Sequence, residues 1–161
     1  MRLPRDVKGE LARIEPARAC CRLAELEGLR FQGGDAIRTL DPSTARVAMR
    51  LSASPATASS ATASRTERGS GTRHHLAVAA PRQGSAWRWA SAKACDRRAF
   101  LRGEVLGSGS LSFSTGGPHV EFVFRDRRRA RRLRRALSTS GMHAAEYERR
   151  GRAVVYLKGR D

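Results

Sequence analysis

The sequence predicts an α+β fold in which one αββαββ unit occurs twice about a pseudo-two-fold axis, with its strands joined in a curved, saddle-shaped antiparallel sheet. Three observations support this class. A helix-forming segment recurs 75 residues later in the chain. Both copies of that helix carry small residues four positions apart. The second half of the chain alternates helix and hairpin signals in a clear order.

In the first half, apolar residues recurring on one face predict a helix over 6–14 and a second helix over 19–30. Segments 35–40 and 45–51 alternate apolar and polar residues around Asp41-Pro42-Ser43-Thr44, which predicts a hairpin.

The middle of the chain is poor in large side chains. Residues 52–64 are only Ser, Ala, Thr and Pro, and no large apolar residue occurs over 52–75. A segment with little to bury is expected to form a weakly anchored Ala-rich helix or to stay mobile. Another hairpin is predicted from strands over 76–80 and 87–90.

The second half predicts helix, hairpin, helix, hairpin. The expected segments are a helix over 94–106, strands over 110–114 and 119–124, a helix over 126–138, and strands over 143–149 and 152–158.

The internal repeat supplies the proposed symmetry. Seven of sixteen positions are identical when residues 19–34 are laid on residues 94–109. The predicted organisation is an arm over 1–18, a first repeat over 19–92 and a second over 93–161, together one domain. Small residues let two helix backbones approach closely, so the two helices are expected to pack through Ala24, Gly28, Ala99 and Gly103.

Three cysteines, Cys20, Cys21 and Cys95, show no zinc-like spacing. We interpret them as reduced thiols, and Cys20 and Cys95 as small buried apolar residues at matching positions. A metal or redox role is the less favoured alternative, and we expect no cofactor and no bound metal.

The charge predicts a polyanionic partner. The chain carries a formal charge of +17 in 161 residues, which attracts nucleic acid by counterion release, although anionic membrane surfaces and acidic proteins respond to the same field. No apolar run is long enough for a spanning helix or a leader peptide, so a cytoplasmic location is expected.

Four stretches resemble a known family. They are Val7–Arg13, Cys20-Cys21-Arg22-Leu23-Ala24-Glu25-Leu26, Arg98–Gly103 with Gly107–Leu111, and Arg149–Lys158. They are similar to the bacterial WhiA regulators, whose amino-terminal half is a degenerate LAGLIDADG homing-endonuclease fold. The resemblance implies a nucleoid-associated DNA-binding role in transcription, cell division and sporulation, with transcription or division proteins as further partners. The family's carboxy-terminal helix-turn-helix lies outside these residues, so we expect a fragment or a short form.

The resemblance also places the metal-binding acids of a LAGLIDADG nuclease. Such a nuclease holds divalent metal on one carboxylate from each repeat helix. The matching positions here are Gly33 and Ser108. A shift of two residues gives Asp35 in the first repeat but Ser110 in the second. No pair of carboxylates is restored, so we expect binding without cleavage.

Binding would use the outward face of the saddle. Strand alternation places on that face Arg38, Arg46, Arg50, Arg125, Arg152 and Lys158. For any single cation a solvated polar face explains the sequence equally well. The seven arginines between Arg127 and Arg135 are interpreted as the solvated face of a helix. A protein-interaction module that meets an acidic partner is the alternative to DNA binding, and a salt titration of DNA binding would separate the two.

Overall fold

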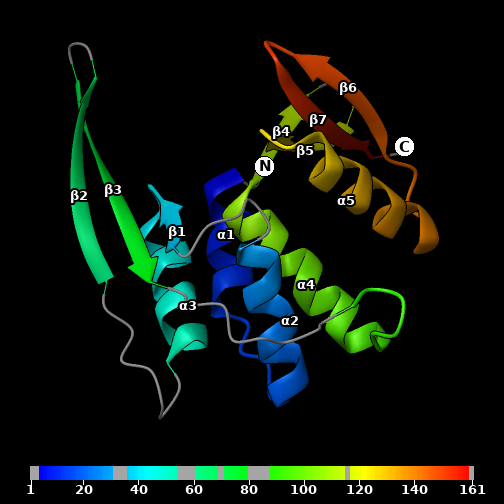
Figure 1. The fold of residues 1–161 in the computed structure, drawn as a ribbon, viewed down its shortest axis with the longest axis horizontal. Coiled ribbons are helices and arrows are strands. Elements are labelled where there is room, and N and C mark those ends of the chain that lie inside the picture. The colour runs from blue at the N-terminus through cyan, green and yellow to red at the C-terminus, as the bar shows by residue number, and fades with distance from the viewer. Residues whose placement is uncertain are drawn as a thin grey trace. The chain divides into compact units, whose positions relative to one another are not determined.

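The computed structural model describes residues 4–30, 36–53, 61–68, 71–79, 88–114 and 117–159. The elements are α1 (Pro4–Arg13), α2 (Ala19–Leu29), β1 (Ala36–Thr39), α3 (Pro42–Ser52), β2 (Ala61–Arg68), β3 (Gly71–Ala79), α4 (Ala94–Gly107), β4 (Gly109–Ser114), β5 (Gly117–Phe124), α5 (Arg127–Thr139), β6 (Ala145–Arg149) and β7 (Arg152–Lys158). The predicted α+β class is confirmed. Two compact units, Lys8–Gly107 and Ser108–Asp161 with Met1–Val7, are described in turn (Figure 1).

The unit Lys8–Gly107 is built on two helices that run side by side, α2 and α4 (Figure 1). Its strands form an antiparallel sheet in the order β1-β3-β2, and α3 packs on β1 and β3. The buried core draws on helices and sheet alike, with the members Ala12, Leu26, Leu29, Ile37, Ala45, Val47, Ala48, Val78 and Leu106. The helices predicted over 6–14, 19–30 and 94–106 are thus confirmed within a few residues at their ends.

The hairpin predicted over 35–40 and 45–51 is wrong in its second strand, because Pro42–Ser52 is the helix α3. The side chain of Asp41 caps this helix by accepting hydrogen bonds from the backbone N–H of Ser43 and Thr44 at 3.3 and 2.9 Å. Pro42 then occupies the first turn, where no backbone donor is needed. Burial raises the pKa of Asp41, but its hydrogen bonds from Thr44 and Ser43 outweigh that effect and hold the pKa below its ordinary value.

In the low-complexity middle of the chain, residues 61–68 and 71–75 form strands where an Ala-rich helix or a mobile segment was expected, and residues 54–60 and 69–70 lie outside the described residues. Strand β2 pairs with β3 from Ala61 opposite Val78 to Arg68 opposite Gly71. The predicted strand over 76–80 is the end of β3, but its partners are β1 and β2. Residues 89–91 form a turn and residue 88 is irregular, so the strand predicted over 87–90 is wrong over 88–90, and residue 87 lies outside the described residues.

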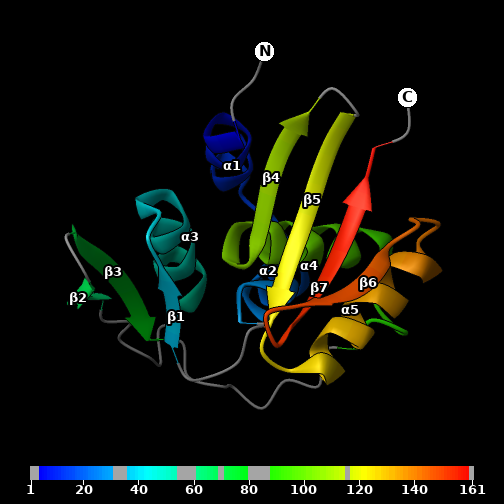
Figure 2. The same cartoon turned by 90° about the horizontal axis from the view of Figure 1, so that it is seen from above.

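The unit Ser108–Asp161 is a four-stranded antiparallel sheet in the order β4-β5-β7-β6 with α5 packed on it (Figure 2). The two hairpins and the helix predicted here are confirmed. Arg150 and Gly151 have φ values of 53° and 70°, and they form the two-residue turn between the paired residues Arg149 and Arg152. Such a turn requires positive φ at both positions, which glycine adopts without strain.

The two sheets share a connectivity. In the order of the chain, β1, α3 and the β2–β3 hairpin correspond to β5, α5 and the β6–β7 hairpin. Asp41 and Asp126 cap the equivalent helices and stand 85 residues apart, whereas α2 and α4 begin 75 residues apart. The segment between the first helix of the repeat and the aspartate that caps the next helix is therefore shorter in the first repeat. None of the helices in the described part of the chain is long and apolar enough to cross a lipid bilayer.

Candidate functional site

Helices α2 and α4 pack with their backbones in direct contact. A Cβ atom on Gly28 would lie 2.1 Å from the carbonyl oxygen of Phe100, and one on Gly103 would lie 2.1 Å from that of Glu25. Gly28 and Gly103 are equivalent in the repeat, as are Glu25 and Phe100, so the contact is formed twice about a local pseudo-dyad. Ala24 and Ala99 are 0 and 2% exposed. Gly28 and Gly103 therefore lie at the contact, and Ala24 and Ala99 are buried on the same two helices.

Two carboxylates are buried in the same helix pair, and the sequence analysis did not identify either. Glu25 and Glu104 are both fully buried. The guanidinium of Arg102 donates a hydrogen bond to Glu25 and forms an ion pair with it. Glu25 and Arg102 are 77 residues apart in the sequence, whereas neighbours on one helix surface are three or four residues apart. Only the crossing of α2 and α4 therefore reveals this contact. Both side chains are enclosed, so neither reaches a surface at which phosphate could be held.

The predicted acid positions carry no carboxylate in the residues described. Ser108 ends the turn after α4, and Ser110 is an exposed residue of β4. Gly33 and Asp35 lie outside the described residues. A hydroxyl in place of a carboxylate lacks the charge needed to hold Mg²⁺ over a scissile phosphate.

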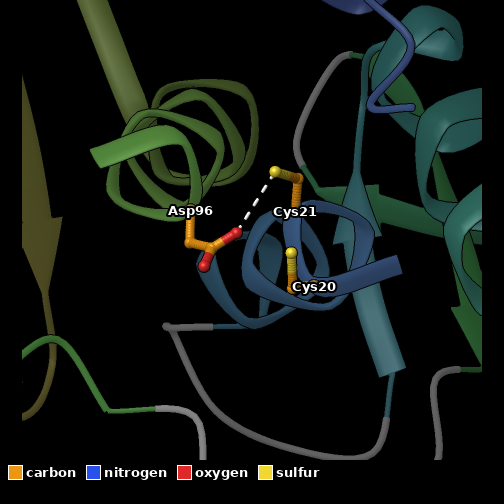
Figure 3. Close-up of side chains that lie close together, drawn as sticks. All are labelled: Cys20, Cys21 and Asp96. Carbon is orange, nitrogen blue, oxygen red and sulfur yellow. Dashed lines mark hydrogen bonds between the residues drawn. The ribbon is translucent and has the colours of Figure 1, made fainter. Parts of the chain in front are cut away.

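The first turns of α2 and α4 bring thiols and a carboxylate together (Figure 3). The Cys21 thiol donates a hydrogen bond to Asp96 at 3.1 Å. The ligand atoms of Cys20, Cys21 and Asp96 lie within 4.8 Å of one another. Burial, with hydrogen bonds to Asp96 and Cys95, raises the pKa of the Cys21 thiol to about 12. Hydrogen bonds from Cys21 and Cys20 hold the pKa of Asp96 below its ordinary value.

The interpretation of Cys20 and Cys95 as buried apolar residues is wrong. Cys20 is exposed, Cys95 is partly exposed, and Cys21 is the buried cysteine. The repeat pairs Cys20 with Cys95 but Cys21 with Asp96, so the buried thiol meets an acid at its own equivalent position.

The four-stranded sheet has one face covered by α5 and one open face (Figure 2). The strand register places Arg152, Tyr156 and Lys158 on one face of β7, opposite the face of Ala153 and Val155. Arg127 and Arg134 of α5 form ion pairs with Glu146 of β6, which is paired with Val155, so α5 lies over the face of Val155.

Two predicted DNA contacts, Arg152 and Lys158, share the open face, and both are exposed. Arg125 is exposed in the bend directly after β5, beyond the paired residues Phe124 and Ala153. The sequence analysis missed Arg149 on the open face, because its hydrogen bond to Glu121 at 3.1 Å joins β6 to β5 across the intervening strand β7, a proximity that only the fold creates.

The three DNA contacts predicted in the first repeat lie on two different elements. Arg38 is exposed on β1 beside the buried Ile37, as alternation predicts. Arg46 and Arg50 are also exposed, but they lie on α3, so their assignment to a strand face is wrong. Arg50 instead forms an ion pair with Glu15 at 3.1 Å.

The arginine-rich helix α5 has the predicted division of faces. Ala130, Leu133 and Leu137 are buried, and most of its arginines are exposed. Arg127 and Arg134 form ion pairs with acids of β6 at 3.7 and 3.4 Å. Part of the charge is therefore balanced within the unit.

Comparison with known proteins gives one family. Residues 97–161 match the family model of the WhiA LAGLIDADG-like domain. The resemblance to WhiA is confirmed. The chain is 29% identical over 184 aligned positions to a probable cell division protein WhiA of Heliobacterium modesticaldum, which covers 95% of this chain. It is 40% identical over 67 residues to the WhiA of Alkaliphilus metalliredigens, which covers 42% of this chain.

Solved structures show the same fold. The crystal structure of the amino-terminal LAGLIDADG domain of a WhiA protein matches 98% of this chain and 84% of its own, with a TM-score of 0.81 and 17% identity. Full-length WhiA from Thermatoga maritima matches 99% of this chain and 58% of its own, with a TM-score of 0.76 and 15% identity. The chain spans 58% of the H. modesticaldum WhiA and 21% of the A. metalliredigens one.

Proposed function

We propose that this chain is a DNA-binding module of the WhiA type, which holds duplex DNA without cutting it. It would act in the cytoplasm at the nucleoid, in the control of transcription, cell division and sporulation. The cell-division names of its relatives support this role. The observation that carries the proposal is the open face of the four-stranded sheet, where Arg152 and Lys158 are exposed opposite α5, with Arg125 exposed in the bend after β5.

A sheet face of this kind suits phosphate contacts. Exposed cations on strands of one sheet are held at fixed spacings by the backbone pairing, so they position a duplex without specifying its sequence. Arg38 stands in the same way on the three-stranded sheet. Joining both sheets into one saddle stays a prediction, and the test below does not depend on it.

Replacing Arg125, Arg152 and Lys158 together with glutamine is expected to flatten the salt dependence of DNA binding. Each phosphate contact contributes about 0.9 to the slope of log K against log salt, so three lost contacts remove roughly 2–3 from that slope. Fluorescence anisotropy with a labelled duplex at several salt concentrations measures it.

The matched control removes the same charge from α5. Arg128, Arg131 and Arg135 are exposed arginines of that helix, and their replacement with glutamine is expected to change the slope by less than half as much, because only the long-range field is weakened. Equal effects of both triple variants would contradict a sheet-face site and favour the protein-interaction module.

We expect no strand cleavage. Supercoiled plasmid incubated with the protein and Mg²⁺ should stay supercoiled, because Ser108 stands at the acid position of the second repeat. An agarose-gel nicking assay checks this. Nicking that disappears on addition of a chelator would overturn the non-cleaving part of the proposal.

A further inference from the structure

The thiols and the carboxylate at the start of α2 and α4 form a cluster that shares no residue with the DNA-binding face proposed above. All four side chains belong to the unit Lys8–Gly107. Cys20 and Cys21 are in the first turn of α2, and Cys95 and Asp96 are at equivalent positions in the first turn of α4. Helix α2 therefore supplies two thiols and α4 one carboxylate to one place, and the sulfur of Cys95 lies 3.8 Å from that carboxylate.

The separations in the cluster lie within about 1 Å of those in a tetrahedral metal site. Zinc binds thiolate sulfur at about 2.3 Å and carboxylate oxygen at about 2.0–2.2 Å, so neighbouring ligand atoms of a tetrahedron stand about 3.5–3.8 Å apart. Asp96 Oδ1 lies 3.1 Å from the sulfur of Cys21 and 3.8 Å from that of Cys95. Cys20, Cys21 and Asp96 have ligand atoms within 4.8 Å of one another.

The burial of Asp96 points independently to a cation. Its side chain belongs to a residue only 6% exposed. A buried carboxylate is normally matched by a cation or a metal. Among the described residues, thiols and the backbone N–H of Lys93 supply its hydrogen bonds, and no arginine or lysine forms an ion pair with it. Cys20 is exposed and leaves a route for an ion from solvent.

The donors are the thiol sulfurs of α2 and α4 and the carboxylate oxygen of Asp96. In the metal-free chain the Cys21 thiol keeps its proton, because its pKa is raised to about 12, so a bound metal must displace that proton. The site thus combines soft sulfur donors with one hard oxygen, a set that suits zinc better than calcium or magnesium.

We propose that Cys20, Cys21 and Asp96 bind one Zn²⁺ ion, with Cys95 as the fourth ligand, and that the ion fastens the first turn of α2 to that of α4. Each thiol gives its proton to solvent as its sulfur–zinc bond forms, and Asp96 binds as the carboxylate. The partly exposed Cys95 side chain turns towards the ion to complete the tetrahedron.

Native mass spectrometry of the full chain, purified reduced and mixed with Zn²⁺, tests this proposal. One zinc per chain is expected. Asp96→Asn should weaken zinc binding at least about tenfold, and Cys21→Ser at least as much, because metal sites lose that factor even on loss of outer partners. Cys20→Ser separates zinc binding from folding, because Cys20 is exposed and its replacement leaves no gap in the core.

Cobalt substitution reads the ligands directly. Co²⁺ in place of zinc should give a thiolate-to-metal charge-transfer band and the visible bands of a tetrahedral ion. The charge-transfer band should fall by about a third in Cys20→Ser or Cys95→Ser if three thiolates bind. An unchanged band in Cys95→Ser would overturn its assignment as a ligand.

Glu148→Gln is the matched control, because it removes one exposed carboxylate from β6, outside the unit that holds the cluster. Its zinc affinity should equal that of the unaltered chain. Three freely reactive thiols in the presence of zinc, or a disulfide between Cys95 and either partner in place of metal binding, would overturn the site. These readouts involve no DNA, so their failure and that of the DNA-binding proposal are distinguishable.

Discussion

Replacing Gly28 with alanine is expected to lower the free energy of unfolding by about 2–3 kcal/mol. The new methyl group would stand 2.1 Å from the carbonyl oxygen of Phe100 and 2.9 Å from the backbone nitrogen of Glu104. These are backbone atoms, so relief requires α2 and α4 to move apart. Alanine's better helix propensity returns only about 1 kcal/mol. Urea unfolding followed by circular dichroism measures the change.

Gly9→Ala is the control for this substitution. Gly9 lies in α1, and nothing stands within 4 Å of a Cβ placed there. The same exchange should therefore raise the free energy of unfolding by about 0.5–1 kcal/mol. A loss at Gly28 no larger than the change at Gly9 would contradict the close helix contact.

Glu25→Gln is expected to cost about 3 kcal/mol of the free energy of unfolding. Glu25 is fully buried, and the side chain of Arg102 is only 13% exposed. Removing one partner leaves the other charge without compensation in a medium that solvates it poorly, which typically costs about 3–5 kcal/mol. The same urea titration measures this loss.

The exposed pair of Glu15 and Arg50 provides the comparison. Their side chains are 71 and 38% exposed, and Glu15→Gln should change the free energy of unfolding by less than about 1 kcal/mol because solvent screens the pair. Similar losses in both variants would show that Glu25 and Arg102 contribute little beyond a surface contact.

The sequence predicted the second repeat because its signals agree with one another. Between residues 94 and 158, glycine breaks, alternation and helical spacing all indicate the same elements. The glycine contact of α2 with α4 could be predicted equally well, since the repeat places Gly28 on Gly103. Small residues at matching positions of two helices predict close packing of those helices even when the fold is unknown.

The first repeat was mispredicted at α3 because its signals are ambiguous. Asp41-Pro42-Ser43-Thr44 fits a turn and a helix start equally well, since both use a capping acid followed by proline. Val47, Met49 and Leu51 alternate as a strand would, whereas Ala45 and Ala48, which are buried, complete the helical face. Alanine is so common in this chain that its spacing does not distinguish a helix from a strand here.

The strand β2 and the polar contacts of the helix pair depend on partners distant in the sequence. Strand β2 comes from a tract without large apolar residues, and it is a strand because its backbone groups pair with β3. Glu25 meets Arg102 only through the crossing of two helices. The 75-residue shift does place Cys21 on Asp96, so that contact could have been predicted had equivalent positions been expected to touch near the pseudo-dyad.

The end of the compact unit at Gly107 has a consequence for dividing the chain. The sequence repeats from residue 94, yet α4 belongs to the same compact unit as α2. A cut at the start of the repeat would strip α2 of its glycine-lined neighbour and leave Glu25 without Arg102. The compact unit thus includes the first helix of the second repeat, so duplication of the sequence has not produced two interchangeable halves.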